Sequence, residues 1–294
     1  GVGVSWIAVM RLWDGAVNMQ NDYWVGIYGN RNSLAPVAAV ASLAAVVVVS
    51  FVRERLVPNW SRIVALAVPA AVVVFAAIEM WRSGSQTSPV ALAVAVTACV
   101  AWLVVRTVAA RFGMLRTLRH HAAPITLALV AVFAAIALRQ IGDATNISAD
   151  TATFNSRRAL WSVNWSGFLE KPWLGWGWMA ARFNPEFFKQ GTWWAAVETQ
   201  WSHNGYHDLL LGGGVLAAAL FALCVWVSSR RFDRTPVSVA LPRLALVVFV
   251  LAAATQESFF VGSHFLWALL IVSLAAARDD VASVDEQNPG HRTT

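Results

Sequence analysis

Residues 35–52 read APVAAVASLAAVVVVSFV, an apolar run without a charged side chain that ends at Arg53. A helix needs roughly 20 such residues to cross the hydrocarbon core of a bilayer. Comparable runs occur at 62–81, 89–106, 124–141, 206–228, 241–258 and 263–277. The runs are continuous rather than alternating, which is typical of membrane helices and not of outer-membrane strands. We therefore predict an all-α fold, a polytopic transmembrane helix bundle with about seven spans and a large external, partly helical loop.

The composition excludes other classes of protein. The 294 residues are 58% hydrophobic and only 13% charged, with a mean hydropathy of +0.56. This leaves too little polar surface for an ordinary soluble enzyme, a disordered chain or a nucleic-acid-binding module. The two cysteines lie in apolar runs, so neither a disulfide framework nor a thiolate metal cluster is expected.

Positive charge predicts the orientation of the chain in the membrane. Arginines gather in the loops 53–62, 106–121 and 229–243. Two predicted spans separate each of these loops from the next, so all three can face the cytoplasm. We predict a multi-pass protein of the cytoplasmic (inner) membrane. One large segment, 142–205, is left on the outer side, which is the periplasm or the extracellular space.

Four parts follow from this topology. They are N-terminal membrane helices at 1–141 with a truncated start, an external Trp- and Arg-rich loop at 142–205, C-terminal membrane helices at 206–277, and a disordered cytoplasmic tail at 278–294. The external part holds half of the 16 tryptophans. These indoles favour either an aromatic belt at the headgroup level or a platform for sugar rings.

Three polar clusters fall on the predicted outer side, at 28–33, at 155–177 and at 202–208. Each has an ordinary structural explanation, such as lipid anchors, turn residues or a solvated loop. His203 and His207 are four residues apart, a spacing that suits two metal ligands, but no obvious third ligand accompanies them. We therefore expect no metal site and no cofactor.

Taken together, the clusters resemble the O-antigen ligase and polymerase family of bacterial membrane glycosyltransferases. That family has an Arg-x-x-x-Trp element followed by Pro-x-x-Gly-x-Gly, matched by residues 157–161 and 172–177. A His-Asn-x-Tyr element then opens a helix and is matched by 203–206. An upstream element before a span is similar to residues 29–34, which include Asn32.

One element departs from the family pattern. The family carries an arginine in a short external loop, and Gln86 stands in its place. A neutral amide cannot replace a guanidinium on a diphosphate. Arg82, at the preceding helix end, takes over this role, or donor binding is altered.

The resemblance implies that a glycan moves from undecaprenyl diphosphate to an acceptor hydroxyl on the outer face of the membrane. His203 is then the general base, because imidazole titrates near neutral pH. Base-assisted displacement would invert the anomeric carbon without a metal. The other residues expected to bind the diphosphate or the sugar are Arg157, Arg158, Arg82, Asn204, Tyr206, Trp161 and Asn32.

The expected partners are the lipid-linked glycan donor, a glycan, lipid or wall-polymer acceptor, and the bilayer, with no nucleic acid. Ligase and polymerase share the donor chemistry and are not separated by these motifs. The main alternative is a transporter or flippase of lipid-linked oligosaccharides, which would place charged groups inside the spans. A scaffold or inactive relative is a third reading, favoured by Gln86.

Overall fold

This computed structural model describes residues 2–10, 15, 17–18, 22–28, 31–54, 59–112, 121–130, 132, 151–178, 180, 202–260 and 264–275. The chain forms two compact units. The first comprises Gly1–Val100 and Pro236–Phe249, and the second comprises Ala101–Thr235 and Val250–Thr294. Part of the expected span 124–141, parts of the external segment and the whole predicted tail lie outside the described residues.

Within the described residues, four helices are long and apolar enough to cross a membrane. They are α2 (Arg31–Glu54), α3 (Asn59–Arg82), α4 (Thr87–Arg111) and α10 (Gly205–Phe232). Two shorter apolar helices, α11 (Val237–Ala253) and α12 (Phe265–Ala275), overlap the last two predicted spans. The all-α, polytopic fold is therefore confirmed.

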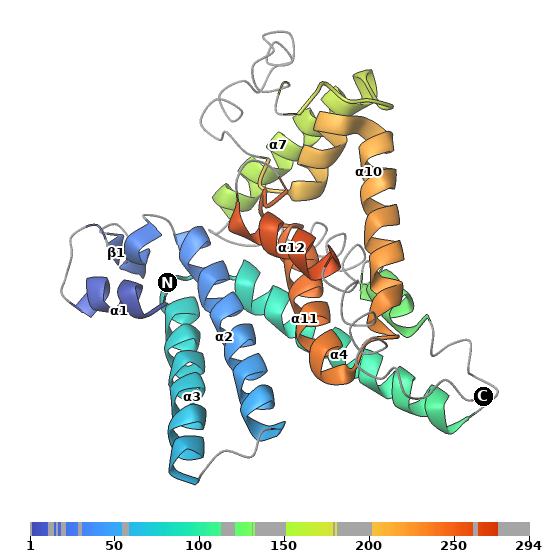
Figure 1. Ribbon diagram of the computed structural model, residues 1–294. Coiled ribbons are helices and arrows are strands. Elements are labelled where there is room, and N and C mark those ends of the chain that lie inside the picture. The colour runs from blue at the N-terminus through green and yellow to red at the C-terminus, as the bar shows by residue number, and fades with distance from the viewer. Residues whose placement is uncertain are drawn as a thin grey trace, which may run out of the picture. The chain divides into compact units, whose positions relative to one another are not determined.

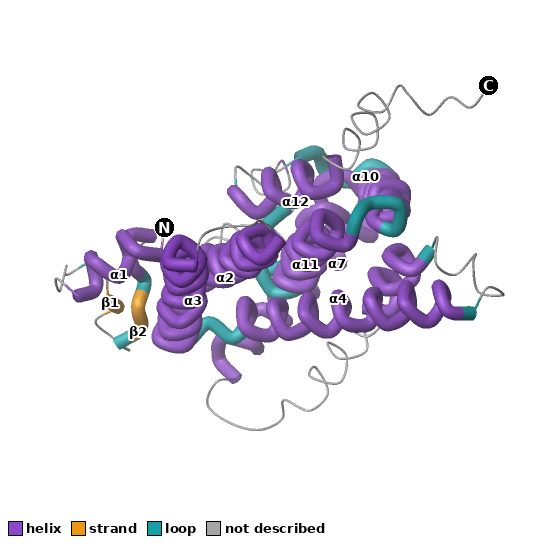
Figure 2. Tube along the Cα trace, turned by 60° about the horizontal axis from the view of Figure 1, so that its bottom comes forward, coloured by secondary structure: helices purple, strands orange, loops and turns teal. Residues whose placement is uncertain are grey.

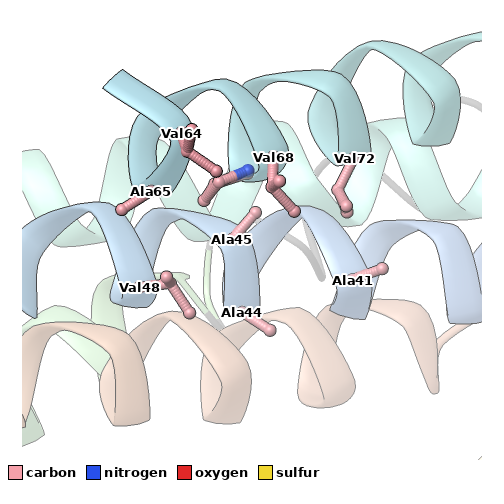
Figure 3. Close-up of a pocket in the computed structure, with 9 residues that line it drawn as sticks. Ala41, Ala44, Ala45, Val48, Val64, Ala65, Val68 and Val72 are labelled. Carbon is pink, nitrogen blue, oxygen red and sulfur yellow. The ribbon is translucent and has the colours of Figure 1, made fainter. Parts of the chain in front are cut away.

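In the first unit, α2 and α3 lie side by side (Figures 1 and 2). Alanine and valine dominate where they face each other, so the two backbones approach closely. Between them lies an apolar groove of about 600 Å³ (Figure 3). It is lined by Ala41, Ala44, Ala45, Val48, Val64, Ala65, Val68, Pro69 and Val72.

A small cap packs near the ends of these two helices. It consists of α1 (Val2–Met10), the antiparallel strands β1 (Val17–Asn18) and β2 (Tyr23–Trp24), and the 3-10 helix η1 (Gly26–Tyr28). Aromatic contacts hold the cap to α3. The ring of Trp6 lies 5.5 Å from that of Trp24 and 4.9 Å from that of Phe75.

In the second unit, α10 is broken at Gly214, where the backbone adopts φ 64° and ψ −164°. Figure 1 shows α10 as two limbs that meet at a bend. This conformation is essentially restricted to glycine. The predicted span at 206–228 lies within α10, which is long and apolar enough to cross a membrane, but the apolar pattern did not predict the break at Gly214, because hydropathy does not report backbone angles.

The break is filled by the turn that follows α7 (Thr151–Glu170). Two amides of this turn, those of Trp176 and Gly177, donate to the carbonyl oxygens of Leu211 and Gly212 at 2.9 and 3.0 Å. In the other direction, the amides of Val215 and Leu216 donate to the carbonyl oxygens of Pro172 and Trp173 at 2.8 and 3.2 Å. The four bonds satisfy backbone groups that the break removes from the helical ladder.

The far end of α10 is fixed by a buried carboxylate. Asp233 accepts hydrogen bonds from Nε1 of Trp102 at 2.7 Å and from the amide of Ala123 at 3.0 Å. Burial raises the pKa of Asp233, although both hydrogen bonds and the nearby Arg106 act in the opposite direction. The cluster joins α4, the segment after residue 121 and the end of α10 within the second unit.

Helix α11 ends earlier than the run 241–258 predicted. It stops at Ala253, and a turn follows. The amide of Gly205 donates to the carbonyl oxygens of Ala254 and Glu257, at 2.8 and 3.1 Å. The turn therefore supports the start of α10. The apolar pattern of the sequence does not predict this contact.

Candidate functional site

The site is built around the start of α10, where Asn204 is the N-cap. Its Oδ1 accepts hydrogen bonds from the amides of Tyr206 and His207, at 3.0 and 3.2 Å. These bonds satisfy amides that the first helical turn leaves without partners. Asn204 is buried, and its backbone angles are those of extended chain. The sequence element His-Asn-x-Tyr thus places His203 immediately outside a capped helix end.

The backbone of His203 is in the left-handed region, with φ +50°. Histidine adopts this region uncommonly, and such a conformation persists only where the surroundings enforce it. Here both neighbours are anchored. Oγ of Ser202 donates to the carbonyl oxygen of Asn204 at 2.7 Å, and the carbonyl oxygen of Ser202 accepts from Nε1 of Trp161 at 2.8 Å. The imidazole is therefore presented by a backbone held on both sides.

The imidazole of His203 is paired with a carboxylate. Its Nδ1 lies 3.3 Å from Oε2 of Glu257. The side chain of His203 is 27% exposed and that of Glu257 only 10% exposed. A carboxylate at Nδ1 favours the tautomer that carries its proton there, which leaves Nε2 as the basic nitrogen.

Glu257 was not among the residues that sequence reasoning selected. A signal was present, because an acidic residue near the end of an apolar run is a candidate for function. In the sequence, Glu257 is a charge near the end of the apolar run 241–258 and belongs to none of the motifs. Its distance to His203 follows from the turn after α11, which contacts the start of α10 through Gly205.

Tyr206 and Trp161 have clear structural contacts. Oη of Tyr206 donates to the carbonyl oxygen of Leu251 at 2.8 Å, and its ring packs edge-on against Phe260 with centroids 5.2 Å apart. The indole of Trp161 lies 5.7 Å from the ring of His207. Trp161 therefore lies beside the segment that carries His203, whereas Tyr206 ties α10 to the end of α11.

Arg157 and Arg158 are in α7, one helical turn before Trp161. The indole of Trp161 bonds to Ser202. The side chains of Arg157 and Arg158 lie outside the described part of the structure, so their assignment rests on the sequence motif.

Arg82 and Asn32 belong to the first unit. Arg82 is the last residue of α3, and its exposed guanidinium stacks over the ring of Trp24, 5.3 Å from the centroid. Asn32 is in the first turn of α2 and is half-buried. Gln86, in place of the family's arginine, is exposed just before α4. Arg82 is thus the described cation nearest in sequence to this position.

The fold and this site define an α-helical, multi-pass membrane protein with a paired histidine and carboxylate at the start of a membrane helix. The family model described as O-antigen ligase matches residues 61–222, more than half of the 294 residues. The chain belongs to the O-antigen ligase family and is an O-antigen ligase-like membrane enzyme. No curated protein matches the sequence.

Proposed function

We propose that the enzyme transfers a glycan from undecaprenyl diphosphate to an acceptor hydroxyl, with His203 as the general base. The observation that carries this proposal is the 3.3 Å contact between Nδ1 of His203 and Glu257. The reaction belongs on the outer face of the cytoplasmic membrane, since the arginine-rich loops favour a cytoplasmic position for the opposite helix ends.

The chemistry of the base follows from this pair. A sugar hydroxyl is a poor nucleophile, and Nε2 of His203 removes its proton as the oxygen attacks the anomeric carbon. The imidazolium that forms is stabilised by the carboxylate of Glu257 at Nδ1. The bond from the anomeric carbon to the diphosphate oxygen breaks on the opposite side, so the configuration inverts.

The leaving diphosphate needs fixed positive charge. Arginine suits this purpose because its planar guanidinium donates paired hydrogen bonds to phosphate oxygens. We assign Arg157 as the principal ligand and Arg158 as a secondary one, supported by their position one turn before Trp161. Arg82 and Asn32, which belong to the first unit, are further candidates to bind the diphosphate or the sugar. With arginines stabilising the charge, the mechanism needs no metal.

The remaining predicted residues act on the sugar or on the base. Trp161 offers an indole face to a pyranose ring beside the base. Asn204 and Tyr206 act mainly by holding His203 in place, which is supported by the helix cap of Asn204 and by the bond from Tyr206 to Leu251. In this proposal the segment 142–205 is the external catalytic part, between the membrane helices of 1–141 and 206–277, and 278–294 is a cytoplasmic tail.

The test is a comparison of surface glycans from cells that carry the intact gene, its deletion, His203→Ala or His121→Ala. His121 is a matched control because it precedes the segment 122–130, remote in sequence from the start of α10. We expect His203→Ala to reproduce the deletion at unchanged membrane abundance and His121→Ala to behave as the intact protein. Normal glycans in His203→Ala would overturn the assignment of the base.

Gel electrophoresis of the same glycans distinguishes a polymerase from a ligase. Loss of chain-length laddering, with single repeats remaining, indicates a polymerase. Long chains that stay on the lipid carrier indicate a ligase. Identical patterns in the deletion and the intact strain would contradict the proposed substrate.

A further inference from the structure

The turn after α7 bonds to α10 through backbone atoms, and its large apolar side chains are exposed. Trp173 and Leu174 are 73% and 69% exposed, and Trp178 is also exposed. Trp165 and Leu169, at the end of α7, extend the same kind of surface. A gathering of large apolar side chains marks a contact with a partner or a membrane.

This surface continues into the membrane helix α10. Leu216 and Val215 are exposed apolar residues at the start of its second limb. Their amides bond to the carbonyl oxygens of Trp173 and Pro172. The exposed residues of the turn therefore lie at the same level along the axis of this limb as its first residues, and backbone hydrogen bonds hold both there. This level is called the height of the turn.

The height can be estimated from the length of that limb. From Val215 to Phe232 it is about 27 Å long at about 1.5 Å per residue. That length is close to the thickness of the hydrocarbon core, about 30 Å. Arg230 and Arg231 mark the headgroup layer at the far end. Val215 and Leu216 then lie at the opposite boundary of the hydrocarbon, together with Trp173 and Leu174.

A cation accompanies the apolar surface. Nζ of Lys171 lies 3.9 Å from the centroid of the Trp176 ring, and Lys171 is exposed, as is its neighbour Glu170. Indoles and lysines are the side chains that favour the boundary between hydrocarbon and headgroups, with the ammonium directed toward lipid phosphates. The chemistry of the turn thus matches its estimated height.

We infer that residues 171–178 and the end of α7 form a membrane-interface anchor. In this anchor Trp173, Leu174 and Trp178 insert at the hydrocarbon boundary and Lys171 contacts phospholipid phosphates. The partner is the lipid bilayer itself. The anchor holds α7 at a set height, and Trp161 in α7 bonds to the segment that carries His203. This inference does not depend on the identity of the glycosyl donor.

The test measures how deeply residue 174 lies in the full-length chain reconstituted in lipid nanodiscs. The background is Cys99→Ala with Cys224→Ala, and single cysteines replace Leu174, Leu220 or Arg234, each labelled with the same fluorophore. Leu220 is an exposed residue of the α10 span and reports lipid, whereas Arg234 is exposed beyond its end and reports water. Brominated acyl chains quench from within the bilayer, and iodide quenches from the water.

We expect the label at 174 to be quenched by bromine within about twofold of the label at 220, and by iodide about fivefold less than the label at 234. Trp173→Cys is a second reporter and should agree. Strong iodide quenching and weak bromine quenching at both positions would overturn the inference and favour a sugar-binding platform in water. Protection from both quenchers would also overturn it, since it indicates burial against protein.

Discussion

Nδ1 of His203 lies 3.3 Å from Oε2 of Glu257, although the two residues are 54 positions apart in the sequence. The pair joins the start of α10 to the turn after α11. In the proposed reaction His203 is the base, and the carboxylate of Glu257 orients its ring and stabilises the charged form.

Glu257→Gln should lower kcat for glycan transfer about 10- to 100-fold, because an amide does not stabilise the imidazolium. KM for the acceptor should change much less, since Glu257 acts through His203. The measurement is steady-state transfer by the purified enzyme in nanodiscs. Glu170→Gln is the matched control, because Glu170 is exposed at the end of α7. Equal activity of Glu257→Gln and the unchanged protein would show that the pair is only structural.

Gly214→Ala should destabilise the protein by at least about 2 kcal/mol, because φ 64° with ψ −164° excludes a Cβ atom and that atom would collide with the backbone of Trp173. Gly175→Ala should behave similarly, since its Cβ would lie 2.6 Å from the carbonyl oxygen of Leu211. Thermal unfolding in nanodiscs measures both effects.

Gly212→Ala is the control for these two variants. Gly212 is in the first limb of α10, and the nearest atom to an added Cβ is 3.6 Å away, an ordinary contact. Its Tm should remain close to that of the unchanged protein. If all three variants have the same Tm, the interlock between the turn and α10 does not contribute to stability.

Arg157→Lys should lose most of the transfer activity, about 10- to 100-fold, although the charge is kept. The ammonium cannot reproduce the paired, planar donors of a guanidinium on a diphosphate. KM for the lipid-linked donor should rise along with the fall in kcat. Arg230→Lys, at the far end of α10, is the matched control. Full activity in Arg157→Lys would indicate an anchor to lipid headgroups instead.

His264→Asn should flatten the dependence of stability on pH below neutrality. Burial lowers the pKa of His264, while Glu257 acts in the opposite sense. The unfolded chain takes up a proton near pH 6.5 and the folded chain only at lower pH, so the free energy of unfolding decreases as the pH falls from about 6.5 to the lowered pKa.

Asparagine is chosen for this variant because Nδ1 of His264 accepts from the amide of Leu266 at 3.3 Å, and the asparagine oxygen can replace that acceptor. Denaturation at pH 7 and pH 5 should show a smaller loss of stability in His264→Asn than in the unchanged protein. Equal losses would mean that His264 does not contribute to the acid sensitivity of the fold.

The apolar runs predicted most of the described helices, because the demand of a bilayer on backbone hydrogen bonds is local in the sequence. The runs 35–52, 62–81 and 89–106 lie within α2, α3 and α4. The motif around His203 likewise predicted that a helix starts directly after the histidine, since capping depends on adjacent residues. Each of these features is encoded within one turn or one run.

Tertiary structure decided the rest. Glu257 becomes the partner of His203 only because Gly205 rests on the turn after α11, and the apolar run 241–258 did not reveal that turn. The break at Gly214 exists because the turn after α7 supplies four backbone hydrogen bonds to it. Hydropathy and local propensity therefore determined which segments of this protein enter the membrane, whereas bonds between residues distant in sequence decided which side chains meet and where a helix bends.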